Sequence, residues 1–483
     1  MYIGLDLGSS GLRALLIDDQ QQVRGSAEAH YDMLRPHAGW SEQNPADWIQ
    51  ATKSCFAALR ADFPNDLSAV RGIGISGQMH GATVLDKARN VLRPCILWND
   101  TRSAAEAAEL DANPQFRALT GNIVFPGFTA PKLAWMRNHE PELFAQADLV
   151  LLPKDYLRLW LTGEEVGDYS DAAGTSWLDG GSRRWSAELL AETGLKPENM
   201  PRLVHGSDAS GMVRDAVARD LGLPAGVVVA GGGADNAVAA CGIGAVKGGQ
   251  GFVSLGTSGV LLAAIDQWAT SPAQAVHAFC HAVPDAWYQM GVTLSATDSA
   301  NWLAGVTGHS VPDMAKSVGE RLSGPSGVTF LPYLSGERTP HNDPTMRGAF
   351  IGLEHQSDSA VLMQAVMEGV AFSIADCMDA LKSSGTAIDT LLAIGGGSQS
   401  RFWVETLATV LNQPIGLLAG GENGAALGAA RLAIMAATGG GTAEVMHAPV
   451  ASETIDPCVE HSAAYADALA RYRRLYPALK AAL

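Results

Sequence analysis

The sequence predicts an α/β protein made of two domains that share one plan. Three observations lead to this prediction. The chain has 483 residues, whereas a single hydrophobic core rarely grows beyond about 250–300 residues. The chain opens with an apolar strand, a turn of small residues and a second apolar strand. A closely similar opening recurs near the middle of the chain, as an internal duplication would produce.

The first elements follow from hydrophobic patterning. Residues 2–7 and 12–17 are apolar segments joined by Gly8-Ser9-Ser10-Gly11, which predicts a β-hairpin. A third strand is expected over 23–31 and a helix over 48–60, where apolar residues recur at helical spacing. A short apolar strand is expected over 70–75.

The repeat predicts where the two domains meet. Residues 254–262 (SLGTSGVLL) echo 6–14 (DLGSSGLRA), and the glycine-rich turn at 394–399 echoes 75–78 in the same order. The segment 247–251 (KGGQG) is polar and glycine-rich, so it predicts a flexible joint. The expected domains are therefore 1–246 and 247–483.

The composition narrows the classes of function and the expected location. A net charge of −17 disfavours nucleic acid and anionic membranes as partners. No charge-free apolar run reaches membrane-spanning length, and the N-terminus lacks the basic segment of a signal peptide. The six cysteines form no CxxC pair, which indicates buried, reduced thiols and a cytoplasmic protein.

The two hairpin turns are candidate phosphate-binding sites. Turns of small residues expose backbone N–H groups and allow an anion to approach closely; the alternative is a pair of ordinary tight hairpins. Neither turn is a Walker loop, because the pattern GxxxxGK[ST] is absent. Neither is a dinucleotide fingerprint, because each turn leads into a strand rather than a helix. Asp6 precedes the first turn. A carboxylate beside phosphate requires an intervening cation, so Asp6 is a candidate to orient Mg²⁺, directly or through water.

Asp235 is the candidate general base. It follows Gly231-Gly232-Gly233-Ala234, after an apolar strand expected over 227–230, and precedes a helix of small residues expected over 236–241. A carboxylate there can accept the proton of an alcohol that receives a phosphoryl group. The alternative is a purely structural N-cap. Both are compatible, and capping would keep the pKa of Asp235 low enough for it to stay ionised.

Two further segments are candidate ligand contacts. Met79 and His80, in GQMHG, follow the strand expected over 70–75, where open α/β sheets place ligands, and His80 could donate to a sugar hydroxyl. A lone histidine is more often structural. The turn at 394–400 and the small-residue helix expected over 422–430 could together form a slot for an adenine ring.

Two patterns suggest other chemistry without supporting it. His277 and His281 lie four residues apart, but their apolar neighbours indicate a strand, and no further ligand cluster lies nearby in sequence. Ser170-Asp171 and Ser335-Gly336-Glu337 lack the GxSxG context of a nucleophilic serine.

The chain resembles the FGGY carbohydrate kinases. The resemblance rests on motifs that occur in order along nearly the whole chain: DLGSSGLR at 6–13, WSEQNPADW at 40–48, GQMHG at 77–81, LWNDTR at 97–102, APKLAW at 130–135, LLPKDYLR at 151–158, DAAGTSWLD at 171–179, GGGADNA at 231–237, SLGTSG at 254–259, FLPYLSGERTPHNDP at 330–344 and AIGGGSQSRFW at 393–403.

The resemblance implies two actin-like, ribonuclease H-like ATPase domains with a cleft between them. It also implies transfer of phosphate from ATP–Mg²⁺ to D-xylulose, with Asp235 as base and Asp6 near the metal. Implied sugar contacts are Met79, His80, Asp235 and Asn236. Implied nucleotide contacts are Gly8, Ser9, Ser10, Arg13, Gly256, Thr257, Gly395, Gly396, Gly397 and Ser398. A homodimer is an expectation at family level only.

Small departures from the family pattern occur at Ser9, where threonine is usual, and at Arg13, where lysine is common. Asp298 stands where a small residue is usual, without an explanation from sequence. Two alternatives stay open. One is another sugar kinase of the superfamily, acting on ribulose, L-xylulose, gluconate or a deoxy-ketose. The other is a non-catalytic ATP switch of the actin or Hsp70 type.

Overall fold

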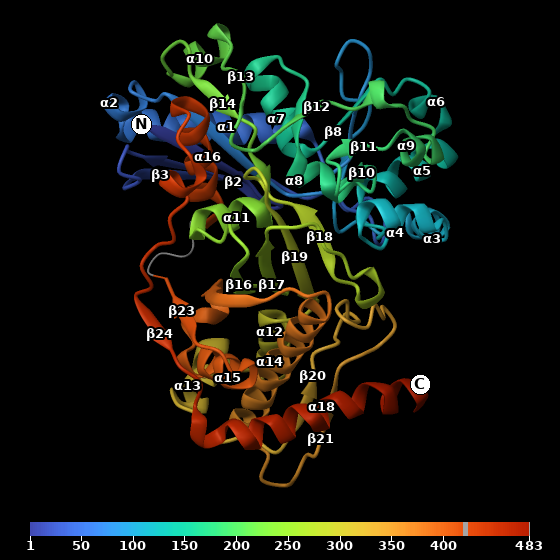
Figure 1. Ribbon diagram of the computed structural model, residues 1–483, viewed down its shortest axis with the longest axis vertical. Coiled ribbons are helices and arrows are strands. Elements are labelled where there is room, and N and C mark those ends of the chain that lie inside the picture. The colour runs from blue at the N-terminus through green and yellow to red at the C-terminus, as the bar shows by residue number, and fades with distance from the viewer. Residues whose placement is uncertain (419–423, 483) are drawn as a thin grey trace.

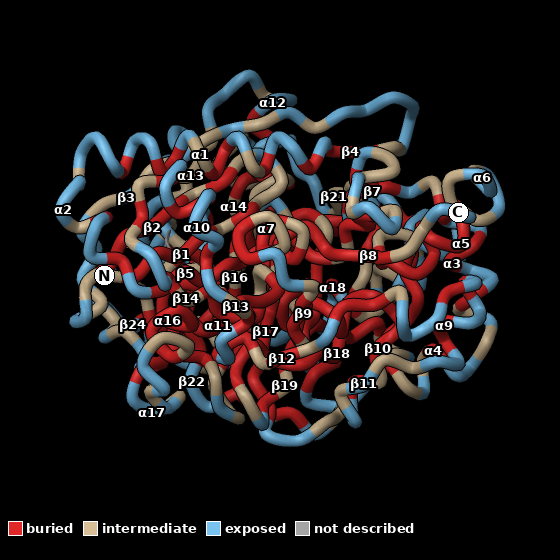
Figure 2. The backbone as a smooth tube through the Cα atoms, turned by 90° about the horizontal axis from the view of Figure 1, so that it is seen from above, coloured by how far each residue is buried: buried red, intermediate tan, exposed pale blue. Residues whose placement is uncertain are grey.

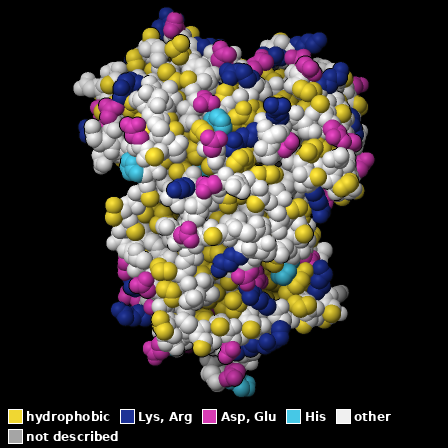
Figure 3. All heavy atoms as spheres, viewed as in Figure 1, with side chains coloured by type: hydrophobic (Ala, Val, Ile, Leu, Met, Phe, Trp, Pro, Cys, Tyr) yellow, Lys and Arg dark blue, Asp and Glu magenta, His cyan; other side chains and the backbone are white. Residues whose placement is uncertain are grey.

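The computed structural model describes residues 1–418 and 424–482. The chain forms two lobes stacked along the long axis of the molecule (Figure 1). The outline narrows between them, and on the face shown Lys and Arg are interspersed with Asp and Glu (Figure 3). This arrangement confirms the predicted α/β class and the two-lobed architecture. Ligand sites can form in the narrower region between the lobes.

The first lobe is built on a seven-stranded sheet. β1 (Tyr2–Leu7) and β2 (Gly11–Ile17) form the predicted hairpin, β3 (Val23–His30) continues it, and β5 (Gly72–Gly77) lies parallel to β1. The order is β13-β14-β5-β1-β2-β3, and a short strand, β15, also pairs with β5. The remaining strands span Ala209–Met212 (β13), Val228–Ala230 (β14) and Gly233–Ala234 (β15).

The second lobe repeats this plan. Its sheet order is β18-β19-β17-β16-β22-β23-β24. The hairpin of β16 (Gly249–Leu255) and β17 (Gly259–Ile265) corresponds to β1 and β2, and β22 (Ile388–Ile394) lies parallel to β16 as β5 does to β1. The other strands are β18 (His277–Cys280), β19 (Trp287–Thr293), β23 (Ile415–Leu417) and β24 (Glu453–Ile455). The internal repeat is therefore confirmed at the level of topology.

The joint expected at 247–251 is more ordered than its composition suggested. Gly249 already begins β16, and the side chain of Gln250 accepts hydrogen bonds from the N–H groups of Val246 and Lys247. The division at 246/247 itself stays a prediction.

Helices cover the sheets of the first lobe. α1 (Pro45–Asp62) contains the predicted helical segment and begins at Asn44, whose side chain accepts a hydrogen bond from the N–H of Ala46. The others are α2 (Pro64–Leu67), α3 (Ala104–Asp111), α4 (Pro114–Thr120), α5 (Thr129–His139), α6 (Pro141–Phe144), α7 (Pro153–Thr162), α8 (Tyr169–Ala172), α9 (Ala187–Glu192), α10 (Asp215–Leu221) and α11 (Asp235–Ile243). Buried backbone runs through the centre of the molecule, whereas α2 and α6 lie at its exposed margin (Figure 2).

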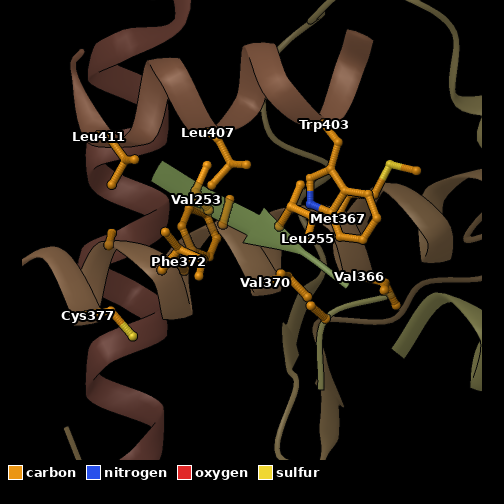
Figure 4. Packing of buried hydrophobic residues seen from close by; sticks show 14 of the residues in the cluster. Val253, Leu255, Val366, Met367, Val370, Phe372, Cys377, Trp403, Leu407 and Leu411 are labelled. Atoms are coloured by element: carbon orange, nitrogen blue, oxygen red, sulfur yellow. The ribbon is translucent and has the colours of Figure 1, made fainter. Parts of the chain in front are cut away.

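The core of the second lobe forms around α14 (Ser359–Ser383). Side chains of α14, such as Phe372, pack with Val253 and Leu255 of β16 and with Leu407 of α15 (Arg401–Leu411) (Figure 4). α14 is long and apolar enough to cross a membrane, but 78% of its apolar window is buried, so it is the core helix of this lobe. The other helices are α12 (Thr297–Thr307), α13 (Val311–Val318) and α18 (Ser462–Ala482), whereas α17 (Thr442–Val445) contacts α16 (Gly424–Thr438).

One helix from the C-terminal part of the chain belongs to the first lobe. α16 (Gly424–Thr438) packs against β1, β5 and α11 (Figure 1). Glycines make this close approach possible. A Cβ at Gly74 would lie 1.8 Å from the carbonyl oxygen of Ala429, and one at Gly428 would lie 1.9 Å from that of Val238. Residues 424–430 of the small-residue helix expected over 422–430 are thus part of α16. Residues 422 and 423 lie outside the described residues, and the adenine slot stays a prediction.

Candidate active site

The candidate base lies beside β5 in the first lobe. Gly233 of β15 and Asp6 of β1 both pair with Ser76 of β5, from opposite sides. Asp235 directly follows β15, and its side chain is partly exposed. The carboxylates of Asp6 and Asp235 therefore project from neighbouring strand ends, the edge where parallel sheets place ligands.

Asp235 is the first residue of α11 rather than its N-cap, which is Ala234. Its Oδ1 accepts hydrogen bonds from the backbone N–H of Asn236 (2.7 Å) and from Nδ2 of Asn236 (2.9 Å). Burial raises the pKa of Asp235 to about 6, and the negative charge of Asp6 adds to this effect. The expectation of a low pKa was wrong, because desolvation outweighs the two hydrogen bonds. A pKa near 6 suits a base that works near neutral pH.

The pKa of Asp6 is also shifted by its surroundings. Burial raises the pKa of its carboxyl group, while a hydrogen bond to Ser76 and the charge of Arg13 lower it. Arg13 forms an ion pair with Glu28 of β3, so its guanidinium already has a carboxylate partner. No group of three or more His, Cys, Asp or Glu side chains that could hold a metal ion occurs in 1–418 or 424–482. These residues fit a Mg²⁺ held mainly by phosphate oxygens and water, with Asp6 as the nearby carboxylate.

The first hairpin turn is held by a network of polar contacts. Ser9 Oγ donates to Oε1 of Gln78 (3.1 Å) and accepts from Nε1 of Trp98 (2.9 Å). The hydroxyl of Tyr31 donates to the carbonyl oxygen of Gly8 (2.6 Å), whereas Ser10 is exposed at the tip. The turn is therefore fixed to the segment that carries Met79 and His80.

His80 lies in a strained backbone conformation. Its φ is 69°, a region that non-glycine residues rarely adopt. Its carbonyl oxygen accepts hydrogen bonds from Nζ of Lys132 (2.7 Å) and Oγ1 of Thr129 (3.1 Å). The ring stacks on Phe128 with centroids 4.4 Å apart. These contacts hold the ring in one orientation.

The protonation state of His80 differs from the one that its expected role as a hydrogen-bond donor requires. Burial lowers the pKa of His80 to about 3, so the ring is neutral. Nδ1 lies 2.7 Å from the carbonyl oxygen of Gly174, which can only accept, so Nδ1 carries the hydrogen. Nε2 is then an acceptor, and His80 can receive a hydrogen bond from a hydroxyl group. Met79 is only 5% exposed.

A cavity of about 580 Å³ lies between the lobes. Its first-lobe wall includes His80, Trp98 and Phe128, and its second-lobe wall includes Glu337, Arg338 and Asn342. The volume falls in the range of small-molecule sites. Asp235 and Asn236 are not part of this lining. They begin α11 directly after Ala234, which pairs with Gly77, three residues before the lining residue His80.

A second cavity of about 790 Å³ lies in the second lobe. Gly396, Gly397 and Ser398 line it, together with apolar groups of α12 and α13. These glycines follow β22, which pairs with β16, so their turn lies beside the second hairpin. The hairpin is tied to the cavity by Thr297, a lining residue whose Oγ1 donates to the carbonyl oxygen of Gly256 (2.7 Å).

Two further nucleotide candidates, Gly395 and Thr257, lie next to residues that line this cavity. Gly395, at φ 85°, begins the turn, and its carbonyl oxygen accepts from Oγ of Ser398 (2.7 Å). Thr257 is exposed, and its carbonyl oxygen accepts from the N–H groups of Ala296 and Asp298. Asp298 thus lies in the first turn of α12, where a carboxylate stabilises the helix N-terminus.

A buried ionic network supports the segment before Asp235. Nζ of Lys154 lies 2.6, 2.7 and 3.3 Å from carboxylate oxygens of Asp155, Asp168 and Asp171. Burial raises the pKa of Asp171 well above its usual value. The network reaches the segment through Ser170, whose Oγ accepts from the N–H of Ala234 (3.1 Å) and donates to Asp168. Sequence reasoning missed this network, although the LLPKDYLR motif pairs a lysine with acids in an apolar context.

His277, His281, Ser170 and Asp171, which suggested other chemistry, have structural contacts. His277 belongs to β18 and His281 directly follows it, as expected, and both are nearly fully buried. Ser170 and Asp171 belong to the ionic network. Five of the six cysteines are buried, Cys458 is partly exposed, and all six are free thiols.

The comparisons with known proteins identify the family. The model of the FGGY family of carbohydrate kinases, N-terminal domain, matches residues 1–242, and the C-terminal domain model matches 251–437. The chain therefore belongs to the FGGY family of carbohydrate kinases and is a sugar kinase with its two-domain, actin-like fold.

Three relatives show how close the similarity is. A xylulose kinase of Escherichia coli (strain K12) is 46% identical over 482 residues, covering 99% of each chain. A xylulose kinase of Klebsiella pneumoniae is 49% identical over 440 residues, covering 90% of each. The crystal structure of a "xyloylose kinase" from Brucella ovis superposes with a TM-score of 0.98 at 57% identity over 100% of both chains.

Proposed function

We propose that this protein transfers the γ-phosphoryl group of ATP to D-xylulose, giving D-xylulose 5-phosphate and ADP. The observation that carries the proposal is the Asp235 carboxylate, partly exposed beside the interlobe cavity, with a pKa of about 6. Support for the acceptor comes from the xylulose kinases that match nearly the whole chain. A non-catalytic ATP switch is disfavoured, because it would not need such a base.

The sugar would occupy the interlobe cavity. His80 Nε2 would accept a hydrogen bond from one hydroxyl group. Asp235, held by both N–H groups of Asn236, would accept the proton of the hydroxyl on C5. As the new O–P bond forms, the bond from the γ-phosphorus to the bridging oxygen breaks, and ADP takes that electron pair.

The nucleotide would occupy the second-lobe cavity. Its base would lie against the apolar groups of α12 and α13, and its phosphates would reach the turns at Gly396–Ser398 and Gly256–Thr257. The first-lobe turn at Gly8–Ser10 would meet the γ-phosphate when the lobes close. Mg²⁺ would neutralise charge on the phosphates, with Asp6 close to it. We also propose a cytoplasmic location, and a homodimer as the expected assembly.

A panel of acceptors tests the proposal. ADP release is measured with D-xylulose, D-ribulose, L-xylulose, gluconate and a deoxy-ketose, each at several concentrations, and without any sugar. D-xylulose is expected to give the highest kcat/KM. A higher kcat/KM for another sugar would reassign the substrate, and slow ATP hydrolysis that no sugar stimulates would favour the switch alternative.

A further inference from the structure

Arg338 is a cation that the second lobe presents to the interlobe cavity. It lies in the connection between β20 (Thr329–Leu331) and β21 (Ala349–Ile351) and lines the cavity together with Ser335 and Asn342. The opposite wall carries His80. Arg338 therefore belongs to one lobe and faces a sugar-contact candidate of the other.

The guanidinium group is held without a carboxylate partner. It lies over the ring of Phe125, 4.3 Å from the centroid, and its Nη1 is 3.5 Å from Nε2 of His277. No ion pair of Arg338 is present within residues 1–418 and 424–482. Burial lowers its pKa only to about 10, so the group is charged at neutral pH. A partly buried cation in this position gains most from a ligand that supplies oxygen acceptors.

The adjacent acid, Glu337, is already committed elsewhere. Its carboxylate accepts from Oγ1 of Thr293 (2.7 Å), Oγ of Ser373 (2.9 Å) and the N–H of Leu294 (3.1 Å). It also accepts from the backbone N–H of Arg338 (2.8 Å). These bonds fix the backbone at Arg338, and the carboxylate of Glu337 is not the partner of the Arg338 guanidinium that lines the cavity.

The two walls of the cavity offer opposite chemistry. Nε2 of His80 and the ionised carboxylate of Asp235 can only accept hydrogen bonds. Both groups therefore select hydroxyl groups. A guanidinium can only donate, so it selects an oxygen that needs no hydrogen of its own. An open-chain ketose has one such oxygen, at its C2 carbonyl. That carbonyl lies at the opposite end of the molecule from the C5 hydroxyl.

From these contacts we infer that Arg338 is a specificity-determining residue that donates to the C2 carbonyl oxygen of the sugar. The assignment rests on the proposed function and extends it. The second lobe then takes part in sugar recognition, and the sugar site is complete only when both lobes contribute.

The test compares a ketose with its reduced form. D-xylulose and D-arabinitol share one carbon skeleton and differ at C2, which carries a ketone in the first and a hydroxyl in the second. KM and kcat are measured for D-xylulose and ATP. D-arabinitol is measured as substrate or as competitive inhibitor. The proteins are the wild type, Arg338→Met, Arg338→Lys and the control Arg219→Met, which changes an exposed residue of α10.

Loss of a charge-assisted hydrogen bond predicts an increase of about 10- to 100-fold in KM for D-xylulose in Arg338→Met. The KM or Ki for D-arabinitol should change less than about threefold, KM for ATP should stay unchanged, and Arg338→Lys should fall between. Arg219→Met should match the wild type.

Equal losses for both acceptors, a fall in kcat alone, or no change would each overturn the assignment. A fall in kcat that is the same for both acceptors would point to a contact between Arg338 and the phosphoryl group instead. ADP-induced thermal stabilisation reports whether each variant is folded. Should Arg338→Met fail this control, the ratio of the two acceptors in Arg338→Lys decides. A wild type that does not phosphorylate D-xylulose would refute the proposed function itself, and the assignment with it.

Discussion

Asp6 and Asp235 stand on opposite sides of β5, and the charge of one raises the pKa of the other. Asp6 pairs with Ser76 in the sheet, and Asp235 follows the strand that pairs with Ser76 and Gly77 from the other side. Burial is the larger cause of the pKa of about 6 at Asp235, and the charge of Asp6 is the second cause that raises it.

This relationship predicts a pH profile. A base must be ionised, so kcat/KM for the sugar should fall about tenfold per pH unit below pH 6. Asp6→Asn removes a negative charge, which should lower the pKa of Asp235 and move the inflection of the residual activity to lower pH. Asp6→Glu, the matched control, should keep the inflection near that of the wild type. An inflection that does not move in Asp6→Asn would contradict the proposed coupling.

Lys132 should make stability depend on pH in the alkaline range. Its Nζ donates to the carbonyl oxygens of His80 and Gly127, both at 2.7 Å, and burial lowers its pKa to about 7 from the usual 10.5. Between pH 7 and pH 10.5, Lys132 is protonated in the unfolded chain and neutral in the folded protein. The contribution of this group to the free energy of unfolding therefore rises with pH from about 7 to 10.5 and is smallest below 7.

Lys132→Met tests this prediction. The difference in free energy of unfolding between wild type and variant should grow as pH rises through that range, measured by urea denaturation. KM for the sugar should also rise, because the carbonyl oxygen of His80 loses a donor. A difference that stays constant with pH would show that Lys132 does not titrate in this way.

The buried ionic network predicts a strong effect of losing Lys154. Lys154→Met leaves three buried carboxyl groups beside Arg158 alone, at a cost of about 3–5 kcal/mol in the free energy of unfolding. The matched control is Lys53→Met, which breaks an exposed pair with Asp220 and should cost about 0–1 kcal/mol. Urea denaturation measures both. Similar costs for the two variants would mean that the network contributes little.

The glycine contacts of α16 predict a contrast between two Gly→Ala variants. Gly428→Ala places a methyl group against the carbonyl oxygen of Val238 and should cost at least about 1–3 kcal/mol. Gly305→Ala, in helix α12, meets nothing within 4 Å and should stabilise by about 0.5–1 kcal/mol. Thermal unfolding separates the two. A neutral Gly428→Ala would show that α16 can shift away from the first sheet.

The sequence predicted most of the first sheet and the repeat, because hydrophobic alternation and small-residue turns are local signals. It placed Asp6, His80 and Asp235 at strand ends correctly. It could not predict the pKa of Asp235, since burial depends on what the rest of the chain packs around it. For the same reason it could not place the helix that contains Ala426 and Gly428. Only the tertiary structure shows that this helix returns to the first lobe.

Arg338 and Lys154 were visible only as members of longer motifs. A charged residue in sequence is usually solvated, so neither had a local signal of burial. The direction of the His80 hydrogen bond was equally unpredictable, because it depends on the carbonyl group of Gly174, 94 residues away. Long-range contacts of this kind decide which ring nitrogen faces a ligand.

The most direct test of the account is the turnover of Asp235→Asn, which removes the base while keeping the size of the side chain. Its kcat for D-xylulose should fall about 10²–10⁴-fold, while the thermal stabilisation by ADP stays at the wild-type value. Near wild-type sugar phosphorylation by this variant would contradict the role of Asp235, on which the proposed function rests.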